Sequence, residues 1–397
     1  MTTTAATGRI DAMKQAMPEN ASDDDIVNAL QQTLTAEKDF HRLFDAKLIQ
    51  ARRKMGLSVI QPTSLDNVPK EHEQQFRDAY VDAAREVGTL FLEDGQLSDA
   101  WAYFRTIGEP ELVKAAIDKI SIPREPDEAF DEIMNVALYE GAHMTRGLEF
   151  LLKTHGTCNT VTALSQLQQQ MTVEERRTAA AMMVRNIYED LQATIRREVE
   201  ARMPVLSPNA GVGELIKGRE WLFAEGNYHI DVSHLHSTVG FARALEKEDP
   251  ELKLAIELCD YGAMLAPQLQ YPADLPFDEY YKANKFFLSA LAEDDVDGGL
   301  EYFMQRLKDE PDEPDQQLIA FVLLDLAQRV GRIEEILQKT VSFVSKMEDP
   351  NGFSFTKLCV DIGQTQQLEE AAVANDDVLA FTIAKLSHGA GNDGAAE

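Results

Sequence analysis

The chain has 397 residues, of which 68 are acidic and 38 basic, giving a formal net charge of −30. A field this negative repels phosphate backbones, and no basic cluster offsets it, so the sequence argues against nucleic-acid partners. Hydrophobic residues make up 44% of the chain, which is enough to bury a sizeable core and excludes global disorder. Helix-favouring residues are abundant and alternating Val/Ile/Thr runs are absent, so we predict an all-α fold.

The cellular compartment is predicted from the cysteines and the N-terminus. Cys158, Cys259 and Cys359 are widely scattered, a pattern typical of reduced thiols in a reducing compartment. The first residues lack the apolar core of a signal peptide, and no run of about 18 apolar residues exists. We therefore expect a cytoplasmic protein with no membrane partner. The acidity is explained either by a solvated, self-repelling surface or by a docking surface for a basic partner.

In chain order, residues 1–22 are mostly small and polar, and we predict that they are disordered. Ser22 precedes three aspartates, which indicates a helix start, because a capping hydroxyl and negative charge both suit a helix N-terminus. We predict one helix from about residue 23 to Met55 and a linker over residues 56–69. These elements open an N-terminal helical block that we assign to residues 23–203.

Small and aromatic residues recur at set offsets between residues 80 and 110. They comprise Gly88 and Phe91 in a first helix, Gly95 in the turn, and Ala100 and Phe104 in a second helix. A small residue lets two helices approach, and an aromatic ring fills the space beside it. This stretch resembles the tetratricopeptide repeat, a helix–turn–helix unit of about 34 residues.

The same turn pattern returns towards the C-terminus. It begins at Asp294, Gly331 and Gly363, at spacings close to that repeat period. Residues 279–388 therefore resemble about three stacked hairpins, within a C-terminal array that we assign to residues 204–386. The Gly/Ala-rich tail, residues 387–397, is expected to be disordered. The resemblance implies a solenoid of antiparallel helical hairpins that binds a partner in a concave groove.

The middle of the chain is less regular. Residues 127–153 read as a hairpin that turns near Gly141. Thr172 and Glu175 form a capping box, which opens a long helix to about Arg202. Two stretches rich in proline, residues 204–213 and 266–281, are predicted to be extended connections.

Three of the eight histidines lie close together within residues 221–245, where we predict a helix, a tight turn at residues 226–228 and a second helix opening near Asp231. One hypothesis is a zinc or iron site formed by His229, Asp231 and His234, because imidazole and carboxylate suit these metals. The other is that the imidazoles bond the turn and line a groove, with His236 beside the buried stripe of the second helix.

A second cluster contains Glu140, His143, His155 and Cys158. Glu140 and His143 have the spacing that places both on one helix face, but di-iron bundles need this motif twice, with two further glutamates. His155 is equally explained as a cation at a helix C-terminus. If both clusters faced one groove, their side chains could form the active site of a metal-dependent enzyme. Glu140 or Asp231 would then serve as a metal ligand or as the general base.

Other catalytic motifs are missing: the sequence contains no dinucleotide fingerprint, phosphate loop or nucleophile elbow. We therefore predict a protein-interaction scaffold that needs no cofactor and binds a protein or peptide partner, with the metal-dependent enzyme as the alternative. Candidate groove residues are Tyr228, His236, His155 and Tyr139. Other tyrosines, among them Tyr271 and Tyr280, offer area and a polar tip for a groove or pack in the core.

Overall fold

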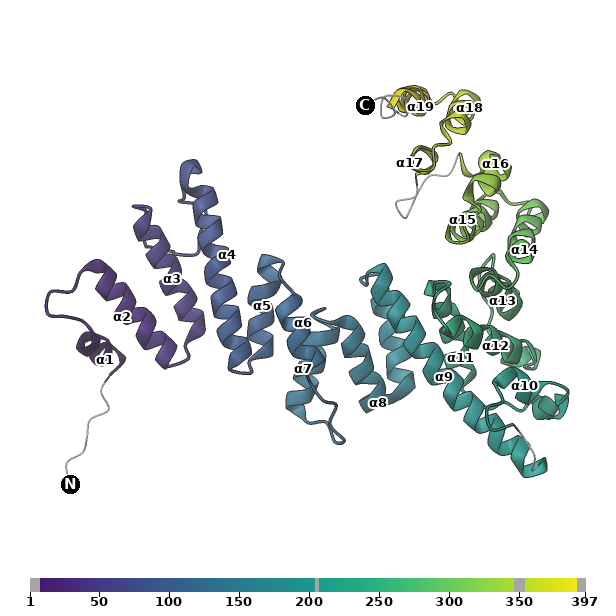
Figure 1. Ribbon diagram of the computed structural model, residues 1–397, viewed down its shortest axis with the longest axis horizontal. Helices are drawn as coiled ribbons and strands as arrows, with labels where there is room; N and C mark the ends of the chain where they lie inside the picture. The colour runs from purple at the N-terminus through teal and green to yellow at the C-terminus, as the bar shows by residue number, and fades with distance from the viewer. Residues whose placement is uncertain (1–7, 204–206, 346–353, 391–397) are drawn as a thin grey trace. The chain divides into compact units, whose positions relative to one another are not determined.

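The computed structural model describes residues 8–203, 207–345 and 354–390 (Figure 1). Its regular elements are all helical in these ranges, which confirms the predicted all-α class. The chain divides into two compact units, Met1–Thr160 and Val161–Glu397, here called unit 1 and unit 2. No helix among the described residues combines the length and the apolar character needed to cross a membrane.

The helices of unit 1 are α1 (Arg9–Ala16), α2 (Asp23–Ala36), α3 (Phe40–Lys54), α4 (Lys70–Glu93), α5 (Leu97–Ile107), α6 (Glu111–Asp118), α7 (Glu128–Leu138) and the greater part of α8 (Met144–Leu167). From α1 to α6, each helix packs against the next along the chain, and α7 packs against α5.

The predicted single helix over residues 23–55 is wrong, because the chain turns back between α2 and α3. Ser22 begins α2 with the predicted capping box: its hydroxyl accepts from the Asp25 N–H at 3.2 Å, and the Asp25 carboxylate accepts from the Ser22 N–H at 2.8 Å. The helix ends where Lys38 takes a positive φ of 57°. This left-handed conformation reverses the chain and allows α3 to pack against α2.

The structure also places helices in both terminal segments that we expected to be disordered. At the start, α1 is fixed by Arg9, whose Nε donates to Glu37 Oε2 at 2.6 Å. At the end, α19 continues to Ala390. Residues 1–7 and 391–397 lie outside the described residues.

The predicted packing of a small residue against an aromatic ring is confirmed between α4 and α5. A Cβ atom at Gly88 would lie 2.8 Å from Cε2 of Phe104, so only glycine allows these helices to approach so closely. Gly147 plays the same part between α7 and α8, where a Cβ would lie 2.7 Å from Cβ of Leu138. The α7–α8 hairpin turns at Gly141, which has a φ of 79°, as predicted.

The predicted linker over residues 56–69 contains no helix and is organised by Arg52 from α3. The Arg52 side chain is fully buried and has no carboxylate partner among the described contacts. Its Nε donates to Pro62 O at 2.9 Å, its Nη1 to Ser58 O at 2.9 Å, and its Nη2 to Ser64 O. One guanidinium thus satisfies three main-chain carbonyls of the linker.

Unit 2 begins in the last turns of α8 and continues as a further series of helices. They are α9 (Val173–Arg202), α10 (Val212–Ile216), the 3-10 helix η1 (Glu220–Gly226), α11 (Val232–Phe241), the 3-10 helix η2 (Ala242–Ala244), α12 (Glu251–Ala263), the 3-10 helix η3 (Pro267–Leu269), α13 (Tyr280–Leu291), α14 (Val296–Asp309), α15 (Glu313–Arg329), α16 (Ile333–Val344), α17 (Phe355–Asp361), α18 (Thr365–Asn375) and α19 (Val378–Ala390).

The long helix α9 has the predicted start and the predicted buried stripe. Thr172 and Glu175 form the capping box, and Val184, Ile187 and Leu191 are fully buried. Because α10, α11 and α12 cover this stripe, α9 belongs to unit 2. The compact units therefore separate at residue 160, whereas the sequence led us to divide the helical blocks at residue 203.

From α12 to α16, each helix packs against the next along the chain (Figure 1). The turns near Gly331 and Gly363 are confirmed, with φ of 71° and 73°. Gly299 of α14 lies against α13, where a Cβ would be 2.6 Å from Cβ of Ala290. Pairs of neighbouring helices packed in this way are compatible with a helical solenoid.

Candidate functional site

His229, the first predicted metal ligand, is a buried hydrogen-bonded residue. Its Nε2 lies 3.0 Å from Glu198 Oε2, and its Nδ1 lies 3.1 Å from the Tyr261 hydroxyl. Burial lowers the pKa of His229 below its ordinary value, and the nearby Glu198 offsets this only in part. Both ring nitrogens therefore have protein partners, and the side chain joins α9, α12 and the segment before α11.

Asp231 begins α11 as predicted, and its carboxylate is used for that purpose. Asp231 Oδ1 accepts from the Ser233 N–H at 2.8 Å and from the His234 N–H at 3.2 Å. The predicted helix before this turn is the short 3-10 helix η1. No group of three or more His, Cys, Asp or Glu side chains that could hold a metal ion occurs in the described ranges. His229, Asp231 and His234 are thus not assembled into the site we hypothesised.

The second predicted cluster lies in unit 1 and has partners of its own. Glu140 Oε1 accepts from Asn135 Nδ2 at 3.1 Å, and His143 Nε2 lies 3.1 Å from Asp118 Oδ1. His155 is exposed, and its Nδ1 lies 2.8 Å from Thr154 Oγ1. Gly156 follows with a φ of 80°, which kinks α8.

The four candidate groove residues are divided between the two units. Tyr139 and His155 belong to unit 1, and Tyr139 is 51% exposed. Tyr228 is 53% exposed in unit 2. His236 lines a pocket in unit 2, and we take this pocket as the candidate site because charged and polar side chains meet there.

This pocket has a volume of about 470 Å³ and is lined mainly by polar groups. We call it the Arg243 pocket. It is formed by the end of α8, the exposed side of α11, η2, the connection after η3 and the start of α13. Its lining residues are Ser165, Gln168, His236, Ser237, Gly240, Phe241, Arg243, Pro272, Ala273, Asp274, Leu275, Phe277 and Tyr280.

His236 is fixed in the wall of the pocket by aromatic neighbours. Its ring stacks on Tyr280 with centroids 3.8 Å apart, and Tyr271 lies at 5.5 Å. Its Nδ1 atom is buried and has no hydrogen-bond partner. Burial lowers the pKa of His236, and the positive charge of Arg243 lowers it further. The imidazole is therefore neutral at pH 7.

Arg243 provides the positive charge of the pocket. Its guanidinium carbon lies 4.2 Å from the centroid of Phe277, and its Nε donates to Gly240 O at 3.2 Å. Burial lowers the pKa of Arg243 below its ordinary value. In the part of the chain that the structure describes, no carboxylate forms an ion pair with this guanidinium.

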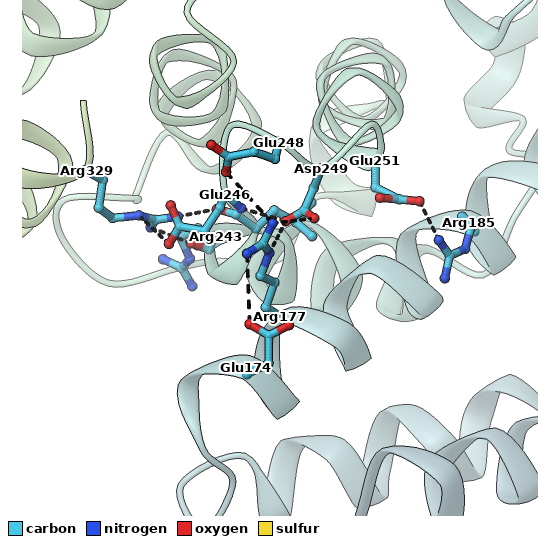
Figure 2. Close-up of polar contacts among 10 residues, drawn as sticks. Glu174, Arg177, Arg185, Arg243, Glu246, Glu248, Asp249, Glu251 and Arg329 are labelled. Carbon is cyan, nitrogen blue, oxygen red and sulfur yellow. Dashed lines mark hydrogen bonds and ion pairs between the residues drawn. The ribbon is translucent and has the colours of Figure 1, made fainter. Parts of the chain in front are cut away.

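The acids that follow Arg243 in sequence are engaged by other arginines (Figure 2). Arg177 of α9 holds Asp249 with two bonds, Nε to Oδ2 at 2.7 Å and Nη2 to Oδ1 at 3.0 Å. Arg329 of α15 lies 3.3 Å from Glu246, Nε to Oε1. The pair of parallel bonds between Arg177 and Asp249 fixes the relative orientation of the two side chains as well as balancing their charges.

Arg329 also fixes the main chain that carries Arg243. Its Nη1 donates to Arg243 O at 2.7 Å, and its Nη2 donates to Leu245 O. The segment after η2 is thus bonded from α9 on one side and from α15 on the other. A charged side chain held on such a rigid segment is suited to binding a ligand of opposite charge.

Sequence reasoning named His236 as a groove candidate and left Tyr271 and Tyr280 as groove or core residues, but it missed Arg243. An arginine followed by several acids reads as one member of a solvated ion-pair cluster. No signal in the sequence shows that those acids bond to Arg177 and Arg329, which lie far away along the chain. Comparison of the sequence with family models and with curated proteins, and of the fold with solved structures, gives no match.

Proposed function

We propose that this chain is a protein-interaction module of tetratricopeptide-like helical hairpins, in which unit 2 binds a protein or peptide partner at the Arg243 pocket. The observation that supports this best is a rigid, polar pocket beside an exposed aromatic side chain, Tyr271, which is 46% exposed. Tyrosine at the rim of such a pocket provides contact area and a hydrogen-bonding tip. We place the module in the cytoplasm on the grounds of its three widely scattered cysteines.

The net charge of −30 favours a partner that is basic overall. Long-range attraction raises the rate of encounter and is screened by salt, whereas a strongly acidic partner would be repelled. Binding should therefore weaken as the salt concentration rises.

Site-specific photo-crosslinking tests this function. A photoreactive phenylalanine analogue is placed at Tyr271 in the full chain, because this ring contacts the lining residue His236. The matched control carries it at Tyr228, which is similarly exposed and has no described contact with a lining residue. In an extract of the source cells, we expect one dominant adduct from position 271 that decreases with added salt. The same adducts at both positions, or none at position 271, would contradict a partner site at the pocket.

A further inference from the structure

The charge of Arg243 is unbalanced within its pocket. A buried or half-buried arginine normally bonds a carboxylate or several carbonyls, as Arg52 does in unit 1 with Pro62, Ser58 and Ser64. Among the described contacts, the Arg243 guanidinium donates one hydrogen bond, to Gly240 O, and lies over one aromatic ring, that of Phe277. Guanidinium donors at a pocket wall without a carboxylate partner are suited to an anionic ligand.

A second polar group in the same wall also has no partner. The buried Nδ1 of His236 makes no hydrogen bond, although burial without a partner costs free energy. The stack on Tyr280 fixes the ring, and the Tyr280 hydroxyl is itself occupied, because it donates to His236 O at 2.5 Å. Because this Nδ1 atom has almost no accessible surface, a ligand in the pocket would bond to the Arg243 guanidinium, and the stacked rings of His236 and Tyr280 would form a fixed wall beside it.

We propose that the Arg243 pocket binds a single carboxylate, held by two parallel hydrogen bonds from the terminal nitrogens of the Arg243 guanidinium, since its Nε already donates to Gly240 O. This inference rests on the proposed partner-binding function and names the chemical group that the pocket receives. A planar guanidinium matches a carboxylate in geometry.

The charge of the site favours a carboxylate over a phosphate group. Arg243 is the one Arg or Lys among the lining residues, and Asp274 at the rim is negative. One positive charge balances a monoanion, whereas the two negative charges of a phosphate monoester usually require a cluster of cations. The strongly acidic chain adds to the repulsion of a dianion.

Nuclear magnetic resonance of the full chain tests this proposal. The Nε–Hε signal of Arg243 and the amide signal of Ser237 are followed during titration at constant ionic strength. The probes are sodium acetate, N-acetylglycine, the uncharged N-acetylglycinamide and inorganic phosphate. Acetate represents a free small acid, and N-acetylglycine represents a carboxylate carried by a peptide.

We expect saturable shifts with both carboxylates, tighter for N-acetylglycine, and none with the amide. A weak single-anchor contact has a dissociation constant on the order of 1 mM. Arg243→Gln should weaken carboxylate binding about tenfold or more, and Arg243→Lys should weaken it less, because it keeps the charge and loses the planar fork. The control Arg332→Gln removes an arginine already paired with Asp297 and should leave binding unchanged.

Equal shifts from N-acetylglycine and its amide would overturn the proposal, as would tighter binding of phosphate or unchanged binding in Arg243→Gln. Tighter binding of acetate than of N-acetylglycine would overturn the peptide source of the carboxylate. The proposed function fails independently. A crosslink at position 271 without carboxylate binding would contradict the carboxylate site and leave the partner-binding function standing. Carboxylate binding without a crosslink would contradict the partner-binding function.

Discussion

Tyr280 contacts His236 in two ways: the rings stack with centroids 3.8 Å apart, and the Tyr280 hydroxyl donates to the His236 main-chain oxygen at 2.5 Å. The two contacts join the start of α13 to α11 and hold the imidazole in the wall of the Arg243 pocket. The Tyr280 ring and the Tyr280 hydroxyl make separate contacts, so substitutions that remove one or both can measure the contribution of each to stability.

Tyr280→Phe removes the hydroxyl and keeps the stack. We expect the free energy of unfolding in urea to fall by about 1 kcal/mol, the usual net effect of one hydrogen bond. Tyr280→Leu also removes the stack and should cost about 2–4 kcal/mol more, since it leaves a cavity in a buried position. Equal losses in the two variants would show that the ring contact contributes nothing.

Arg243 and Arg177 should respond oppositely to the same substitution. Arg243→Met removes a charge that has no carboxylate partner, so we expect the free energy of unfolding to stay unchanged or to rise by up to about 1 kcal/mol. Arg177→Met leaves the largely buried Asp249 without its two-bond partner and should cost about 2–3 kcal/mol. Urea denaturation of the two variants measures both effects. A large loss in Arg243→Met would mean that this arginine is a structural residue.

The stability of unit 2 should depend on pH through His229 and His236. Burial lowers the pKa of both imidazoles in the folded state below the ordinary value of 6.5. As the pH falls below about 6.5, the unfolded chain takes up protons that the folded chain does not, so stability decreases with falling pH. The urea midpoint measured between about pH 8 and 5.5 should therefore decline towards acid.

His229→Gln should make this decline shallower, because the glutamine does not titrate. Its amide can still contact Glu198 or Tyr261, which favours folding of the variant. The same change at His236 should also reduce the slope. If His229→Gln kept the wild-type pH dependence, the imidazole would be protonated equally in the folded and unfolded states.

Gly88 should tolerate no side chain. The Cβ of Gly88→Ala would meet the ring of Phe104 at 2.8 Å, and overpacking of this kind costs about 1–3 kcal/mol. Thermal unfolding of the full chain should show the loss in unit 1. The double variant Gly88→Ala/Phe104→Leu provides the control, since the smaller side chain relieves the clash. Failure of Phe104→Leu to restore any of the loss would contradict direct contact as the cause.

Local signals were read correctly from the sequence where the interacting groups are close together along the chain. Ser22, Thr172 and Asp231 each cap a helix as predicted, because a capping side chain bonds to main-chain groups two or three residues away. The pairing of Gly88 with Phe104 was also predictable, since the two belong to neighbouring helices joined by a short turn.

Other predictions failed where distant segments decide the outcome. The reversal at Lys38 is stabilised by the packing of α2 on α3, which the helical periodicity of residues 23–55 does not reveal. For His229 the sequence left two hypotheses, a metal ligand or a hydrogen-bonded residue of the turn, and it could not name the partners, Glu198 of α9 and Tyr261 of α12.

The sequence by itself determined the helical class, several helix caps and the turns marked by glycine, because these depend on interactions within a few residues or between adjacent helices. Only the tertiary structure decided which charges are balanced. Arg243 is followed by acids in sequence, yet the fold directs Glu246 to Arg329 and Asp249 to Arg177. Ion pairs form between groups that are close in space, so an arginine without a carboxylate partner becomes visible only when the packed helices have placed every carboxylate around it.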